Sequence, residues 1–61
     1  MYNKLLPYKP IIDLFITSGV YSGGGDGLFE IMNVTNRSCP SCLAAALIEA
    51  NNIIKEHERN M

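Results

Sequence analysis

The sequence predicts an α+β fold, a β-hairpin followed by one long C-terminal amphipathic helix. Two segments rich in β-prone residues, 11–22 and 28–34, flank a glycine-rich turn, and a run of helix formers without a breaker begins near residue 38. The chain of 61 residues is expected to form one small domain. A chain of this length buries only about 60% of the surface that it exposes when unfolded. Association with another chain is therefore the expected source of further stability.

Residues 1–10, MYNKLLPYKP, are predicted to form an extended lead-in to the hairpin. Pro7 and Pro10 each favour an extended conformation for the residue that precedes them. The apolar side chains of this segment are then free to lie on the body of the protein or on a neighbour.

Residues 11–34 are predicted to form the hairpin. Its first segment, IIDLFITSGVYS, is rich in residue types that favour strands, and strand alternation places Ile12, Leu14 and Ile16 on one face. The segment GGGDG, at 23–27, has the glycines and the Asp-Gly pair that are typical of tight hairpin turns. The segment LFEIMNV then follows as the second strand.

A short N-terminal helix in place of the first strand is the alternative for this part of the chain. Residues 10–18 fit it because Pro10 suits the first turn of a helix and Gly19 suits its C-terminal end.

Residues 38–59 are predicted to form the long helix. Ser38 is a good N-cap residue, and Pro40 is tolerated in the first turn. One apolar stripe recurs at alternating spacings of four and three residues: Leu43, Leu47, Ala50 and Ile54. From residue 38 to residue 54 the helix carries a single charge, that of Glu49. This apolar surface exceeds what a small hairpin can cover, which indicates packing against a second chain.

The leading hypothesis for function is a small intracellular, non-enzymatic protein-interaction module. Such a module would act as a regulator or inhibitor by binding another protein, and it would self-associate through its helix, as a homodimer. The residues expected at the interface come from the hairpin and the helix: Phe15, Tyr21, Phe29, Leu43, Leu47, Ala50 and Ile54.

Composition argues against several other classes of protein. The five basic residues form no cluster, and the net charge is −1, so no nucleic-acid surface is expected. No segment reaches the length of about 20 apolar residues that spans a bilayer. Asp13 interrupts the apolar stretch 11–20 and no cleavage site follows, so a cytoplasmic location is expected. His57 is the only histidine and has no catalytic partner in the pattern, so neither an enzyme nor a cofactor is expected.

The segment Cys39-Pro-Ser-Cys42 is the one motif with its own chemistry. A thiol at a helix N-terminus has its thiolate stabilised by free backbone N–H groups and by the helix dipole. The order strand, loop, Cys-Pro-Ser-Cys, helix resembles the active-site segment of glutaredoxins and other thioredoxin-fold oxidoreductases. This resemblance implies that Cys39 is the nucleophile and Cys42 the resolving thiol.

The same motif also resembles the zinc hook of DNA-repair ATPases, in which each of two chains contributes a Cys-Pro-x-Cys pair. That resemblance implies a zinc ion held by Cys39 and Cys42 shared between subunits. One chain alone does not complete the site, because His57 would lie about 22 Å from Cys42 along a continuous helix. Thiol-redox and zinc-bridged assembly stay open as alternatives, beside two reduced cysteines buried in the first turn of the helix. A weaker alternative is an oligomeric small-ligand-binding protein in which the glycine loop and the subunit interface form a pocket.

Overall fold

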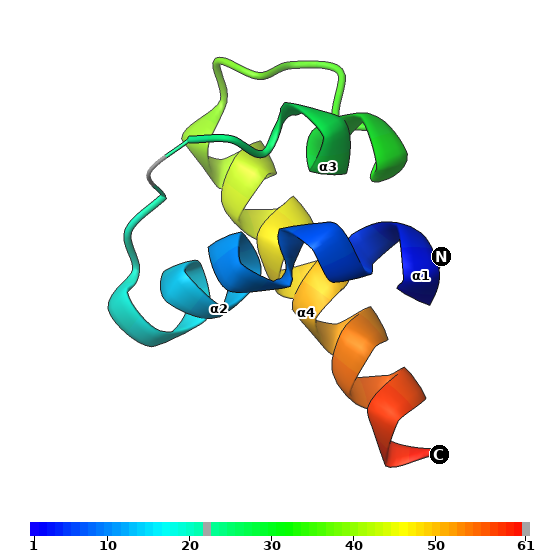
Figure 1. Ribbon diagram of the computed structural model, residues 1–61. Coiled ribbons are helices and arrows are strands. Elements are labelled where there is room, and N and C mark those ends of the chain that lie inside the picture. Colours follow the sequence, from blue (N-terminus) through cyan, green and yellow to red (C-terminus); the bar gives the residue numbers. More distant parts are fainter. Residues whose placement is uncertain (22, 61) are drawn as a thin grey trace.

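The computed structural model describes residues 1–21 and 23–60, and all the regular structure within them is helical (Figure 1). Four α-helices and one 3₁₀ helix follow one another along the chain: α1 (Tyr2–Leu5), η1 (Leu6–Tyr8), α2 (Lys9–Ser18), α3 (Asp26–Ile31) and α4 (Pro40–Arg59). The described residues contain no strand. The predicted α+β class and its β-hairpin at 11–34 are therefore wrong, and Ser22, at the end of the predicted first strand, lies outside the described residues.

The first predicted strand is helix α2, which corresponds to the alternative helix over residues 10–18. Pro10 stands in its first turn, where a missing N–H leaves no hydrogen bond unmade. Gly19 ends it with a positive φ of 74°, and its N–H donates to the Phe15 carbonyl at 2.7 Å. The β-prone composition of this segment is overridden because its side chains pack on α4 in helical register.

The second predicted strand begins as helix α3, which ends in a hydrogen-bonded cap. Asn33 adopts a positive φ of 60°. Its N–H donates to the Glu30 carbonyl at 3.2 Å, and the Val34 N–H donates to the Phe29 carbonyl at 2.8 Å. This is the paired arrangement that terminates helices with a left-handed residue. The apolar residues Leu28, Phe29 and Met32 are thus spaced one and three residues apart. This spacing places them on one side of a helix, whereas a strand would point them to both of its faces.

The predicted lead-in is also wrong, since residues 2–8 form α1 and η1 rather than an extended segment. Pro7 lies at the start of η1 and Pro10 at the start of α2. Both prolines thus occupy first-turn positions, where the ring is compatible with a helix.

The long helix is confirmed, with one correction at its start. It spans Pro40–Arg59, close to the predicted 38–59, and its N-cap is Cys39 instead of Ser38. The Ser38 N–H instead donates to the Asn36 side chain at 3.0 Å, within the preceding turn.

The core lies where the shorter helices meet α4. Figure 1 shows α1 and α2 crossing α4 partway along its length, while the C-terminal turns of α4 extend past them. Eight buried apolar residues fill the contact: Leu5, Ile12, Leu28, Phe29, Ala46, Leu47, Ala50 and Ile54. A Cβ at Gly27 would overlap the Tyr8 hydroxyl, so glycine permits the close approach of α3 to η1. The apolar stripe of α4 is thus covered by the chain's own helices.

A polar cluster ties the N-terminal helices to the last turns of α4. The Tyr2 ring stacks on His57 with 4.0 Å between ring centroids and 13° between planes. The Lys9 ammonium donates to Glu58 at 2.9 Å, and the Tyr2 hydroxyl donates to the same carboxylate at 3.4 Å. The Lys9–Glu58 hydrogen bond raises the pKa of Lys9 and lowers the pKa of Glu58.

These pKa directions predict how the ion pair contributes to stability. Since Glu58 has a depressed pKa, its contribution is complete above the ordinary carboxyl range near about pH 4.3 and is lost as the pH falls through its folded-state pKa. Since Lys9 has a raised pKa, its contribution is complete below the ordinary lysine range and is lost at higher pH. The side chains are 39% and 35% exposed, so the effect is small and weakens in salt.

We expect Lys9→Met to lower the free energy of unfolding slightly at pH 7, because it removes the partner of Glu58. Glu58→Gln should then lower the free energy of unfolding less in the Lys9→Met background than in the wild-type chain. Urea titrations followed by circular dichroism measure these differences. Lys4→Met is the matched control, since Lys4 makes no ion pair with the residues that the structure describes. Additive losses for Lys9→Met and Glu58→Gln would contradict the coupling.

Candidate functional site

The residues predicted for the interface lie mainly in the interior of the chain. Phe29, Leu47, Ala50 and Ile54 are between 0 and 2% exposed. The other three predicted residues are half-buried and pack against the core: Phe15, Tyr21 and Leu43. The prediction assumed a hairpin too small to cover the helix, whereas three segments of the same chain cover it here.

Tyr21 illustrates how these half-buried residues are used within the chain. Its ring lies 5.5 Å from that of Phe29, centroid to centroid, and tilted to it. Its hydroxyl accepts a hydrogen bond from the Gly25 N–H at 3.0 Å. Tyr21 therefore connects the loop after α2 to the core, and only part of it faces outward.

Apolar side chains are exposed instead on the outer side of α2. Leu14 is 45% exposed, Ile16 is 42% exposed and Val20, just after the helix, is 56% exposed. Because successive helical residues are separated by about 100°, Thr17 and Asp13 lie between Leu14 and Ile16 on the outer side of the helix. We call the five residues on this side the α2 surface: Asp13, Leu14, Ile16, Thr17 and Val20.

The polar residues near this surface are largely turned toward the backbone. The Thr17 hydroxyl donates to the Asp13 carbonyl at 2.8 Å, and the Ser18 hydroxyl donates to the Leu14 carbonyl at 2.6 Å. Asp13 carries the only charge between residues 10 and 25. The α2 surface is thus poor in charge, and its hydroxyls are already hydrogen-bonded within the helix.

Sequence reasoning missed this surface because it treated residues 11–22 as a strand. Strand alternation put Ile12, Leu14 and Ile16 on one face. In the helix Ile12 is fully buried while the other two point away from the core. The available signal was the pair Pro10 and Gly19, which marks the two ends of a helix.

The two cysteines lie together at the start of α4. The Cys39 sulfur accepts a hydrogen bond from the Cys42 backbone N–H at 3.2 Å, which makes Cys39 the N-cap of the helix. Cys39 is half-buried, Cys42 is exposed, and both are free thiols. They are therefore not the buried first-turn residues that one alternative expected.

The contacts between the cysteines give the two thiols different acidities. The Cys42 side chain, hydrogen-bonded to the Cys39 sulfur, and then the Cys42 backbone N–H hold the pKa of Cys39 below its ordinary value. The contact with Cys39 and partial desolvation raise the pKa of Cys42. Such a difference favours a thiolate on Cys39, the form of a cysteine that attacks electrophiles and binds metals.

No third metal ligand accompanies this pair among residues 1–21 and 23–60, where no three His, Cys, Asp or Glu side chains cluster. His57 stacks on Tyr2 instead, toward the opposite end of α4. A tetrahedral zinc site built on Cys39 and Cys42 would thus need ligands from a second chain.

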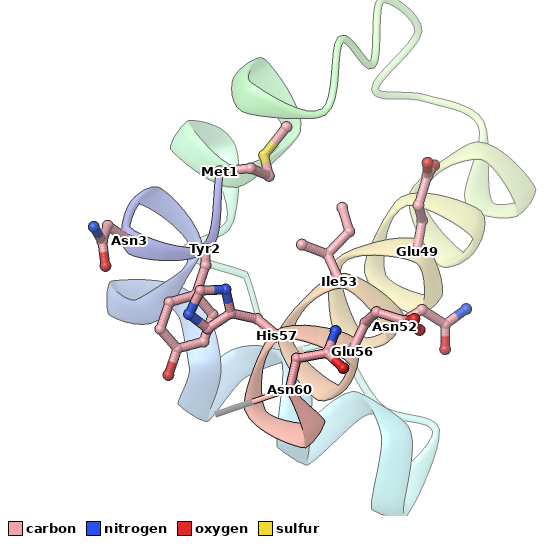
Figure 2. A pocket seen from close by; sticks show the side chains of 9 residues that line it. All are labelled: Met1, Tyr2, Asn3, Glu49, Asn52, Ile53, Glu56, His57 and Asn60. Atoms are coloured by element: carbon pink, nitrogen blue, oxygen red, sulfur yellow. The ribbon is translucent and has the colours of Figure 1, made fainter.

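A groove of about 710 Å³ lies between α1 and the C-terminal half of α4 (Figure 2). Ile53 points into it, with the stacked pair Tyr2 and His57 toward one end and Glu49 toward the other. None of its lining residues comes from the glycine-rich segment 23–27, so this groove is not the pocket between the glycine loop and a subunit interface that the small-ligand alternative describes.

None of the described helices combines the length and the apolar character that crossing a membrane requires. Comparisons with protein-family models, with curated proteins and with solved structures found no match to this chain.

Proposed function

We propose that this chain is a small protein-interaction module that binds through the α2 surface. It associates there with a second copy of itself or with another protein. It acts as a regulator because its binding covers part of the partner's surface. The observation that carries the proposal is the exposure of Leu14, Ile16 and Val20 on a segment with a single charge.

The α2 surface carries one charge among its five residues, that of Asp13, which lies between Leu14 and Ile16 on the outer side of the helix, and this low content of charge supports binding to protein. Depletion of charge, more than overall hydrophobicity, distinguishes the central part of a protein interface from the rest of a surface. The outer side of α4 from Glu49 onward differs in this respect, since it carries exposed charges: Glu49, Lys55, Glu56 and Arg59. We therefore assign the binding face to α2, because the α4 stripe that the sequence predicted is largely buried within the chain.

The size of the chain supports association as well. A chain of 61 residues has a thin core and gains stability when a partner covers exposed apolar surface. Burying one aliphatic side chain contributes about 1.5–3 kcal/mol when it is complete. Leu14, Ile16 and Val20 are already about half covered in the monomer, so each adds only part of that amount, and the cost of association opposes it. A dimer formed on the α2 surface alone is therefore weak.

Sedimentation velocity across the micromolar range tests self-association. We expect the wild-type chain to show a concentration-dependent dimer that the double variant Leu14→Ser, Ile16→Ser lacks. Each lost contact of about 1.4 kcal/mol corresponds to a tenfold weaker dissociation constant. Ile48→Ser is the matched control, because Ile48 is 48% exposed on α4 and outside the α2 surface.

A photo-crosslinking residue at position 17 tests whether the α2 surface binds another protein. Position 17 lies within the α2 surface, and its side chain is exposed. A cross-link that depends on Leu14 and Ile16 would identify the bound protein. A chain that stays monomeric and forms no cross-link in its native cell would contradict the proposed function.

A further inference from the structure

The cysteine pair has an arrangement that the α2 surface does not explain. The N-cap position of α4 is occupied by a sulfur atom, with Cys39 in an extended conformation (φ −94°, ψ 105°) and its side chain turned toward the first turn of the helix. Serine, threonine, aspartate and asparagine are the residues that usually fill this position. Ser38 is adjacent and does not cap the helix, so a thiol stands where an oxygen would stabilise the helix equally well.

The second thiol lies within one helical turn of the first. Cys42 follows Cys39 by three residues, and the hydrogen bond from its N–H to the Cys39 sulfur brings the two residues together. Cys42 is exposed and Cys39 is half-buried, so an incoming molecule can reach the pair from solvent. Pro40 lies between them in the first turn and restricts the backbone that joins them.

A purely structural disulfide is a poor explanation for this pair. A bridge between residues three apart closes a very small loop and removes little entropy from the unfolded chain. In the structure both thiols are free, and the sulfur of Cys39 already contributes to the fold as the helix cap. The arrangement thus suits a pair that changes between dithiol and disulfide.

We propose that Cys39 and Cys42 form a dithiol–disulfide exchange site that reduces a disulfide bond of another molecule. The site does not depend on the α2 surface, and its substrate is defined by chemistry as an accessible disulfide, either of a low-molecular-weight thiol compound or of a protein.

The exchange takes place in two steps that balance. The Cys39 thiolate attacks one sulfur of the substrate disulfide, so that a mixed disulfide forms and the other substrate sulfur leaves as a thiolate. Cys42 releases its proton to solvent, and its thiolate attacks the Cys39 sulfur, which expels the second substrate thiolate. The substrate gains two electrons and becomes two thiols, and the chain loses two electrons and becomes the Cys39–Cys42 disulfide.

The variants that test the site keep the fold intact. Cys39→Ser retains a good N-cap residue, and Cys42→Ser changes an exposed side chain. Ser41→Ala, between the two cysteines in sequence, is the matched control. Circular dichroism checks that each variant keeps the helical content of the wild-type chain.

The reduced chain is mixed with oxidised glutathione in one reaction and, in a separate reaction, with a test protein that carries one surface disulfide. Mass spectrometry follows the products of both reactions. We expect the wild type to lose the mass of two hydrogen atoms as its internal disulfide forms, Cys42→Ser to accumulate the mixed disulfide on Cys39, and Cys39→Ser to react about tenfold more slowly. Reaction with glutathione alone would assign a low-molecular-weight substrate, and reaction with the test protein alone would assign a protein disulfide.

Three results would overturn the proposal. The first is no reaction with either disulfide. The second is a rate for Cys39 in Cys42→Ser no greater than that of the same variant unfolded in urea. The third is a zinc content of about half an ion per chain that blocks both thiols, since it would assign the pair to metal-bridged assembly.

Discussion

Leu47→Ala is expected to lower the free energy of unfolding by about 2–5 kcal/mol, whereas Ile48→Ala, one residue further on, should change it by less than about 0.5 kcal/mol. Leu47 is fully buried between α4 and the helices that cross it, and Ile48 is 48% exposed. Chains shorter than about 70 residues rarely have more than 3–5 kcal/mol of stability in total. The Leu47→Ala variant should therefore be largely unfolded at room temperature.

Urea or thermal unfolding followed by circular dichroism at 222 nm measures this difference at one protein concentration. The neighbouring substitution is a strict control, because both changes remove an aliphatic side chain from the same turn of α4. If Leu47→Ala kept the stability of the monomer and instead abolished association, Leu47 would belong to an interface between chains. That outcome would contradict its place in the core.

Helix α4 was predictable because several local signals agree over its length. Residues 40–59 contain no glycine and no proline after Pro40, and their apolar positions recur at helical spacing. Agreement between propensity, pattern and capping is what makes a segment foldable on local information. The one error, Ser38 as N-cap, arose because Cys39 is an unusual residue in that role.

The shorter helices were not predictable in the same way. Helix α3 has only six residues, Asp26–Ile31, which is too short for a helical period to emerge from the pattern. The Asp-Gly pair that indicated a hairpin turn instead forms the first turn of α3. Asn33, whose positive φ ends the helix, was a usable signal, because asparagine often adopts the left-handed conformation after a helix.

The predicted interface depended on the predicted fold, and the error in one produced the error in the other. With only a hairpin available, the stripe that contains Leu47 and Ile54 had to be covered by a second chain. Because α1, α2 and α3 are helices, they supply Leu5, Ile12 and Phe29 to cover it. The position of the cysteine pair, by contrast, followed from sequence alone, since it required only the start of α4.

Alanine substitutions at three positions of α2 distinguish a helix from a strand without a further structure. Ile12→Ala should lower the free energy of unfolding by about 2–5 kcal/mol, because Ile12 is fully buried against α4. Leu14→Ala and Ile16→Ala should each cost well under about 1 kcal/mol, because both side chains are more than two-fifths exposed.

In a strand these three residues would share one face and one environment. Three similar losses of stability, measured at a protein concentration where the chain is monomeric, would therefore contradict helix α2. A large loss of stability at Ile12 alone requires that Ile12 point to a different side of the segment from Leu14 and Ile16. An α-helix, unlike a strand, turns residues two apart toward different sides. The same result would show that Leu14 and Ile16 contribute little to the fold of the monomer, which leaves them free to contact a partner.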